Sequence, residues 1–284
     1  MDGRRSVGQG TIPLGRPCYA TADTHGPHVS NSRSAMGLLV SLLVLVSACR
    51  AGPPPTYSAH DPRLRRSSLL FYMPDTARSA PRALILFLGN DVGFWEPHQQ
   101  LAARLAGAGY VVVGLDIREY LSHLPSGEPQ RDRTFADSIV PLIAAIRHEV
   151  GEALPLVLGG HSFGAEVAFW IARNHEPTGL VGILAMSPRS SGHLFVTPMD
   201  LANEEAHGEG AWSTIDAVRT IDPRVRIAIV RGSKDQFAVH DSAFAAAGGA
   251  RFHRYLVPFA AHSLKKLLIA GPIVEHAVAY LVGH

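Results

Sequence analysis

The segment that most constrains the fold is the pentapeptide Gly160-His161-Ser162-Phe163-Gly164. It joins an apolar run that predicts a strand, Leu156–Leu158, to a segment that predicts a helix, Phe163–Asn174. Such a connection is so tight that a Cβ at either glycine would strike the strand or the helix. The serine then stands at a helix N-terminus, where the dipole favours negative charge. The pattern indicates a nucleophilic serine, and the alternative is a closely packed turn without chemistry.

Strand-like and helix-like segments alternate through the rest of the chain. Continuous apolar strands separated by helices indicate the α/β class, with a mostly parallel sheet covered by helices on both faces. The predicted strands are Ser67–Met73, Ala83–Leu88, Tyr110–Leu115, Leu156–Leu158, Leu180–Met186, Val225–Val230 and Phe252–Val257. The predicted helices are Glu96–Ala108, Thr134–Val150, Phe163–Asn174 and Leu264–Val282, the last broken near Pro272. A polar stretch over 188–223 interrupts the alternation and predicts a small lid between strands.

Two further residues complete a candidate catalytic set with Ser162. A serine hydroxyl is a weak nucleophile and needs a base that an acid orients. Asp235 follows the strand Val225–Val230, and His262 follows Phe252–Val257, so each lies past the carboxyl end of a strand, where parallel sheets gather their sites. The sequence therefore predicts acyl transfer by Ser162, His262 and Asp235. The alternatives are a turn-forming aspartate and a histidine that merely begins a helix.

The loop Gly89–Trp95, after the first core strand, is expected to complete an oxyanion hole. One donor is the N–H of Phe163, and the second is expected from Asn90, with Asp91 as the alternative. Asp91, Phe94 and Trp95 are expected to line the substrate pocket, although aromatic residues here are as often part of the core. The sequence predicts no metal site and no cofactor, because His148-Glu149 lacks the second histidine of a zinc-binding helix.

An apolar run from Leu38 to Val46 precedes the domain. It is too short to span a bilayer but has the length of a signal-peptide core, with Arg33 before it. The closing Val46-Ser47-Ala48-Cys49 resembles a bacterial lipobox, which implies cleavage before Cys49 and a diacylglycerol on its sulfur. The alternative is a buried helix. We expect a removed leader over 1–48, a lipid anchor and tether over 49–66, and one domain over 67–284.

Composition limits the remaining possibilities. Lys and Arg do not cluster and the formal net charge is +2, so nucleic acid is not an expected partner. Loss of residues 1–48 removes four arginines and two acids, which leaves no net formal charge, so attachment to a membrane depends on acyl chains. Of the two cysteines, Cys18 leaves with the leader and Cys49 is alkylated, which excludes disulfides and a cysteine nucleophile. The expected location is the cell envelope, outside the cytoplasmic membrane; the sequence does not determine the oligomeric state.

The residues described above resemble the α/β-hydrolase superfamily, over nearly all of 67–284. The segments Gly89–Trp95, Val112–Leu121 and Ser162–Glu166 are also similar to the VirJ/AcvB family of bacterial virulence proteins. That resemblance implies an exported protein that acts on aminoacylated phosphatidylglycerol.

The expected activity is that of a serine hydrolase that cleaves a small-molecule or lipid ester through an acyl-Ser162 intermediate. The alternatives are a general envelope carboxylesterase or peptidase, and a non-catalytic lipoprotein that keeps the hydrolase scaffold. An aminoacyl ester carries an ammonium group that needs a carboxylate or an aromatic face. Asp91 and Trp95 could supply these, and so could four residues of the predicted lid. The four are Glu204, Glu205, Glu209 and Trp212. The alternative is that the glutamates among them only solvate a surface helix.

Overall fold

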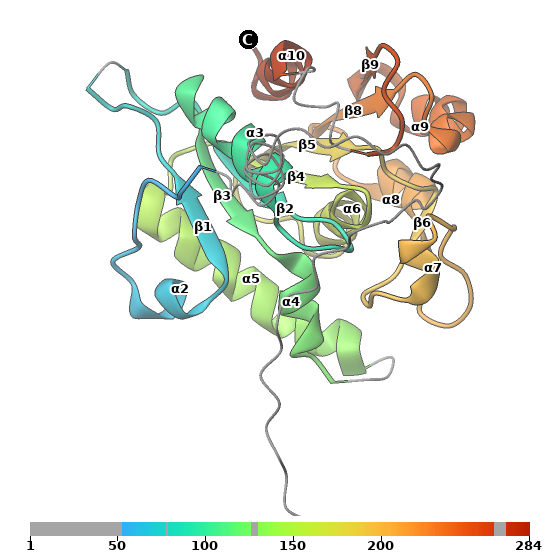
Figure 1. Ribbon diagram of the computed structural model, residues 1–284, viewed down its shortest axis with the longest axis horizontal. Helices are drawn as coiled ribbons and strands as arrows, with labels where there is room; N and C mark the ends of the chain where they lie inside the picture. Colours follow the sequence, from blue (N-terminus) through green and yellow to red (C-terminus); the bar gives the residue numbers. More distant parts are fainter. Residues whose placement is uncertain (1–52, 78, 126–129, 264–270) are drawn as a thin grey trace, which may run out of the picture. The chain divides into compact units, whose positions relative to one another are not determined.

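The residues described by the computed structural model, 53–77, 79–125, 130–263 and 271–284, fold around a seven-stranded β-sheet (Figure 1). The strand order is β1-β3-β2-β4-β5-β8-β9; β1 is antiparallel to its neighbour and the other pairs are parallel. The strands are β1 (Leu69–Tyr72), β2 (Leu84–Leu88), β3 (Val111–Leu115), β4 (Leu156–His161), β5 (Leu180–Met186), β8 (Arg226–Gly232) and β9 (Phe252–Val257). All seven predicted strands are therefore present.

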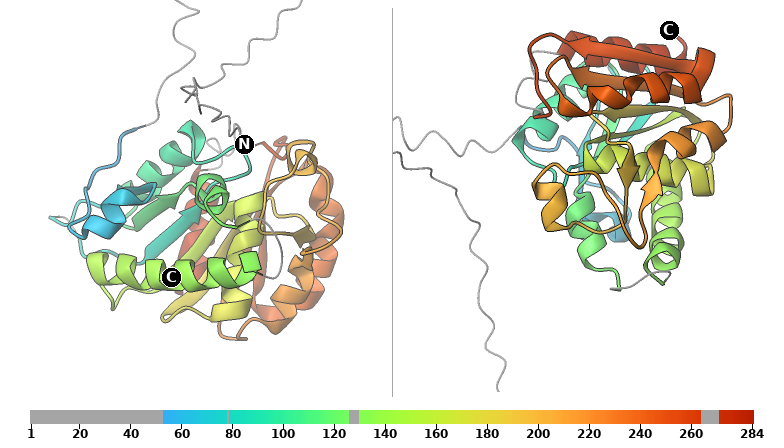
Figure 2. Two further views of the ribbon diagram at one scale, coloured as in Figure 1. Left: turned by 90° about the horizontal axis from the view of Figure 1, so that it is seen from below. Right: turned by 90° about the vertical axis from the view of Figure 1, so that its right-hand side faces the viewer.

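Helices cover both faces of this sheet (Figures 1 and 2). The pleat directs alternate strand residues to opposite sides, so Leu84, Leu86 and Leu88 join one apolar cluster while Ile85 and Phe87 join the other. One face carries α3 (Glu96–Gly107) and α10 (Gly271–Val282). The other carries α5 (Gln130–Val150), α6 (Phe163–His175), α8 (Thr214–Thr220) and α9 (Asp241–Gly248). The two-sided covering explains why the core strands are continuously apolar.

Short elements fill the connections between these layers. They are α2 (Pro62–Arg66), α4 (Ile117–Ser122), α7 (Pro198–Leu201), the 3-10 helices η2 (Gln236–His240) and η3 (Gly249–Arg251), and a small two-stranded sheet of β6 (Ser191–Gly192) and β7 (Trp212–Ser213). Within the described parts of the chain, no helix combines the length and the apolar character needed to cross a bilayer. The predicted leader, Cys49, and the first part of the predicted closing helix, 264–270, lie outside the described residues.

The folded region begins before residue 67. Leu64 is 1% exposed and Ala59 is 3% exposed, and both belong to the core on the α5 face of the sheet. The Tyr57 hydroxyl donates to Glu149 Oε1 of α5 over 2.5 Å. Residues 57–64 therefore pack on the domain, which shortens the tether expected over 49–66, because the apolar residues in that segment have a core to join.

The predicted lid is also shorter than 188–223. Helix α8 packs on α6 and α9 through Ala217 and Val218, and Ile221 directly after it is buried as well. Helix α8 is thus a regular part of the helical layer. Its few apolar residues stand among polar ones, so the sequence shows no clear helical period there. The irregular insertion is confined to 188–213, between β5 and α8.

Candidate active site

Ser162 lies in a strained turn between β4 and α6. Its φ of 51° falls in the left-handed region, which a residue with a side chain rarely adopts, and only 5% of the residue is exposed. A Cβ on Gly164 would lie 2.5 Å from the Leu88 carbonyl oxygen and closer still to that of Gly89, and a Cβ on Gly160 would lie 2.6 Å from the Ala165 nitrogen. Both glycines are therefore required, as the sequence predicts.

The structure places Ser162, His262 and Asp235 in one hydrogen-bonded series. The Ser162 Oγ lies 2.8 Å from His262 Nε2. The other ring nitrogen, His262 Nδ1, lies 3.3 Å from Asp235 Oδ1 and 3.4 Å from Oδ2. Because a carboxylate can only accept, Nδ1 carries the proton and Nε2 is left free to accept the serine proton. The structure thus brings together the three side chains that the sequence analysis selects as a candidate catalytic set.

Backbone contacts between two loops bring His262 to Asp235. The Lys234 N–H donates to the Ala260 carbonyl over 2.8 Å, and the Ser233 N–H donates to Val257 over 2.9 Å. A Cβ on Gly232, at the end of β8, would lie 2.6 Å from the Ala261 carbonyl oxygen. The loop after β8 and the loop after β9 therefore pack backbone to backbone, and a larger residue than glycine at 232 would separate them.

A buried arginine that the sequence reasoning missed supports Asp235. The Arg231 guanidinium donates to Asp235 Oδ2 over 3.0 Å, to Asp241 Oδ1 over 2.7 Å and to the Pro188 carbonyl over 2.8 Å. Although burial alone would raise the pKa of Asp235, the hydrogen bond from His262 and the charges of His262 and Arg231 hold that pKa well below its usual range. Asp235 therefore stays ionised. The signal in the sequence was a cation at the end of an otherwise apolar strand.

The loop Gly89–Trp95 differs from its expected arrangement in two ways. The Asn90 N–H donates to the Gly93 carbonyl over 3.3 Å and closes a turn, so it is not a free second oxyanion donor. The alternative donor, Asp91, stays a prediction. Phe94 is 8% exposed and packs with Phe87 and His98 in the core on the α3 face rather than lining a pocket. Contact with the rings of Phe87 and His98 thus holds Phe94 in the core. Trp95 is half-buried and caps α3.

Asp91 is a buried carboxyl beside the candidate site. It is 8% exposed, and burial, together with the negative charge of Asp200, raises its pKa; the positive charges of Arg189 and His262 act in the opposite direction but do not offset this. Asp91 belongs to the loop after β2, which begins at Gly89 and packs on the first turn of α6 at Gly164. Burial of an ionised carboxylate is costly unless a cation pairs with it.

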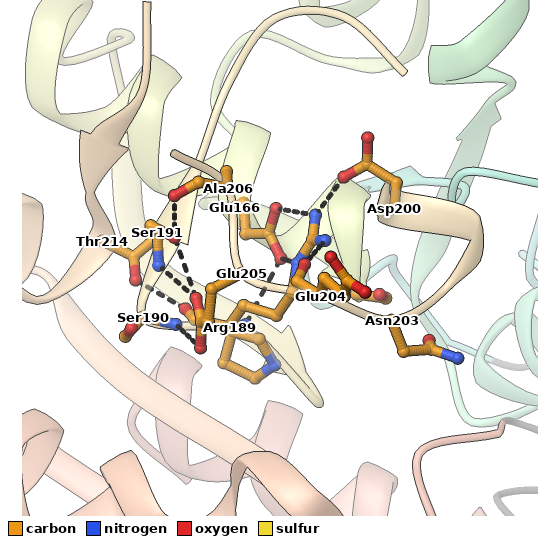
Figure 3. A network of polar contacts seen from close by, with 12 residues as sticks. Glu166, Arg189, Ser190, Ser191, Asp200, Asn203, Glu204, Glu205, Ala206 and Thr214 are labelled. Carbon is orange, nitrogen blue, oxygen red and sulfur yellow. Dashed lines mark hydrogen bonds and ion pairs between the residues drawn. The ribbon is translucent and has the colours of Figure 1, made fainter. Parts of the chain in front are cut away.

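The same region holds a buried network around Arg189 (Figure 3). The guanidinium donates to both carboxylate oxygens of Glu166, each over 2.7 Å, and to Asp200 Oδ1 over 2.6 Å. Arg189, Glu166 and Asp200 are each no more than 3% exposed. The network fastens the insertion to α6 one turn after Ser162. Two buried carboxyl groups are thus set against one guanidinium.

The four lid residues considered for binding a cation do not form such a site. The Glu205 carboxylate accepts from the N–H groups of Ser190 and Ser191 over 3.2 and 3.1 Å (Figure 3) and lies 2.9 Å from His240 Nε2. The Trp212 ring packs on Trp170, with centroids 6.2 Å apart. The other two, Glu204 and Glu209, are exposed. Of the acids considered for this role, Asp91 is the buried one.

Comparison with known proteins supports the fold. No family model and no curated protein matches the chain. Among solved structures, it is similar to the esterase domain of a Rhodothermus marinus protein, at 14% identity and a TM-score of 0.52 over 75% of this chain and 91% of the other. Est1E from Butyrivibrio proteoclasticus gives 11% identity, a TM-score of 0.56 and coverage of 76% and 94%. MenH from S. aureus gives 14%, 0.54 and coverage of 75% and 97%. The fold is that of the α/β-hydrolases. Similarity at this level of identity establishes the architecture and not the reaction.

The close packing at Gly164 predicts an unusual response to alanine. Glycine to alanine inside a helix normally stabilises by about 1 kcal/mol. We expect Gly164→Ala to destabilise the fold instead, by about 1–3 kcal/mol, because its Cβ would meet the carbonyl oxygens of Leu88 and Gly89.

Urea unfolding measures this change. Gly107→Ala in α3 is the matched control, since its Cβ would have no neighbour within 4 Å, and it should be neutral or stabilising. Equal stabilisation by both substitutions would contradict the close packing of the turn on β2.

Proposed function

We propose that the protein is a serine hydrolase that cleaves a carboxylic ester through an acyl-Ser162 intermediate. The observation that carries the proposal is the series of hydrogen bonds from Ser162 through His262 to Asp235, built on a strained turn at the N-terminus of α6. The similarity in fold to a protein domain from Rhodothermus marinus that is named an esterase supports the same reaction class.

In the first half of the proposed reaction, Ser162 Oγ attacks the ester carbonyl carbon while His262 Nε2 takes the hydroxyl proton. The oxyanion that forms accepts from the Phe163 N–H at the start of α6, where the helix dipole favours negative charge, and from the loop after β2. When the bond to the leaving alcohol breaks, His262 gives that alcohol its proton. The acyl group is then bonded to Ser162 Oγ.

In the second half, His262 takes a proton from a water molecule, whose oxygen attacks the acyl carbon. The bond to Ser162 Oγ breaks as His262 returns the proton to the serine, and the carboxylic acid leaves. Asp235 remains ionised throughout, holds the ring with Nδ1 protonated and stabilises the imidazolium that forms twice in each cycle. Its lowered pKa suits this role.

Ser162→Ala should lower ester turnover by about 10⁴- to 10⁶-fold while the fold is kept, because it removes the nucleophile alone. Initial rates on an activated short-chain ester measure the loss, and urea unfolding verifies the fold. Ser122→Ala on the exposed surface of α4 is the control and should retain wild-type turnover. Wild-type rates in the Ser162 variant would exclude the proposed mechanism, and a folded wild type without any turnover of esters or amides would favour a non-catalytic lipoprotein.

We further propose that the ester is carried by a membrane lipid with an ammonium group near the scissile bond, as in an aminoacyl phosphatidylglycerol. One observation and one expectation support this substrate. The observation is that Asp91 is a buried carboxyl, whose pKa is raised by burial and by the charge of Asp200. An enzyme held at a membrane by acyl chains also meets lipid esters at high effective concentration. The resemblance of Gly89–Trp95, Val112–Leu121 and Ser162–Glu166 to the VirJ/AcvB family points to the same substrate.

Asp91→Asn should lower kcat/KM for lysyl- or alanyl-phosphatidylglycerol by about 10- to 100-fold, since it removes a charge-assisted contact, and should leave a neutral ester nearly unaffected. Glu209→Gln, on the exposed part of the insertion, is the control and should change neither substrate. Loss on both esters alike would reject the cation-binding role and leave a general envelope esterase.

The same Asp91 variant provides a test by stability. A carboxyl whose pKa is raised on folding destabilises the native state above that pKa, and the cost disappears as the pH falls through the raised pKa and below the usual value of about 3.9. Asp91→Asn should therefore stabilise the protein at neutral pH, with a gain that fades in acid. A gain that does not depend on pH would contradict the electrostatic explanation.

We propose the cell envelope as the location, with Cys49 as the lipid-bearing residue. The support is the lipobox-like segment that ends in Cys49. Cys49→Ala should move the protein from the membrane fraction to the soluble fraction when expressed in a bacterium that processes lipoproteins. Cys18→Ala is the matched control and should stay with the membrane. Firm membrane retention of the Cys49 variant would reject the anchor.

A further inference from the structure

The rings of His262, His161 and His98 lie next to one another, starting from the base that contacts Ser162. The centroid of the His262 ring is 5.6 Å from that of His161, which in turn is 5.8 Å from that of His98. His161 and His98 are 2% and 0% exposed, whereas the His262 side chain is 15% exposed. The proposed reaction uses only His262, so the two buried rings have no role in it so far.

The hydrogen bonds of His161 settle the position of its proton. His161 Nε2 lies 3.0 Å from the backbone carbonyl oxygen of His262. A carbonyl only accepts, so Nε2 carries the proton and donates it. Burial, with a smaller contribution from the charge of His262, lowers the pKa of His161 to about 3. The ring is therefore a neutral donor at every pH at which an esterase would work.

The contact matters because it acts on the backbone of His262 itself, whereas the backbone hydrogen bonds between its loop and the loop after β8 fall at Val257 and Ala260. The His262 imidazole meets Asp235 only at 3.3 and 3.4 Å, long for hydrogen bonds, and the edge of the Phe237 ring at a centroid distance of 5.1 Å. Its backbone carbonyl is bonded to His161. A displacement of the His262 backbone would carry Nε2 away from Ser162 Oγ, which now lies 2.8 Å from it.

We infer that His161 is a positioning residue, which holds the backbone of His262 so that its ring stays aligned with Ser162. The inference rests on the proposed function and adds to it a residue that acts on the base and not on the substrate. Neutrality is part of the role. A lysine or arginine donor would add a positive charge beside the imidazolium that forms during the reaction and disfavour it. A desolvated histidine donates without that charge.

Two substitutions separate the N–H donor from the ring. His161→Phe keeps a ring of similar volume and loses the donor, and His161→Gln places an amide N–H near the position of Nε2. We expect the Phe variant to lose about 10- to 100-fold in kcat with little change in KM, because misalignment by a fraction of an ångström is enough to cost this much. The Gln variant should recover most of the loss. His148→Gln on the exposed side of α5 is the control.

The rate of covalent modification by a fluorophosphonate gives a second readout, and it should fall in the same order. A Phe variant that reacts as fast as wild type would overturn the positioning role. A Phe variant and a Gln variant that are equally slow and equally destabilised would show a packing role instead. An unreactive wild type would reject the proposed function itself, so the two failures are distinguishable.

A measurement independent of activity covers the case in which a variant does not fold. Long-range ¹H–¹⁵N correlation spectra of the wild type report the protonation of each ring nitrogen. The expected result is a neutral His161 with its proton on Nε2 down to about pH 4, which follows from its lowered pKa. A ring protonated on both nitrogens at neutral pH, or with the proton on Nδ1, would overturn the inference.

Discussion

The site depends on contacts between bare backbones at two glycines. Gly164 lets the first turn of α6 rest on the end of β2, which brings the loop Gly89–Trp95 beside Ser162. Gly232 lets the loop after β8 meet the loop after β9, which brings Asp235 to His262. A Cβ at Gly164 would separate α6 from the end of β2, and a Cβ at Gly232 would separate the end of β8 from the loop after β9. The parallel sheet collects four loops at one edge, but these contacts bring them close enough for hydrogen bonds between the side chains.

Buried ion pairs then hold together the segments that the two glycines allow to come close. Arg231 joins Asp235 to the start of α9 and to the loop after β5, and Arg189 joins the insertion to α6 through Glu166 and Asp200. Such groups are costly to bury, and their stabilising effect depends on complete pairing. Each of the two guanidinium groups binds two carboxylates, and the loop after β2 adds a further buried carboxyl, Asp91. The buried Asp91 carboxyl is the basis for the cationic substrate proposed above.

Much of this arrangement could be predicted from the sequence, for identifiable reasons. Apolar runs located the strands, and the order of Ser162, Asp235 and His262 at their ends located the triad of side chains. The sequence could not place Arg231 or His161, because a buried polar residue is recognised only by its partners. It also missed the packing of Leu64 and the helix α8, since short apolar segments within polar surroundings have no clear period. The turn that uses the Asn90 N–H is likewise decided by loop geometry.

The most direct test of the account is the location of a covalent adduct. Wild-type protein treated with a fluorophosphonate, digested and sequenced by mass spectrometry should carry one phosphonyl group, on the peptide that contains Ser162. Protein unfolded in urea before treatment should carry none, because the reactivity of Ser162 comes from His262 Nε2 at 2.8 Å. A folded protein that does not react, or an adduct on another residue, would contradict the account.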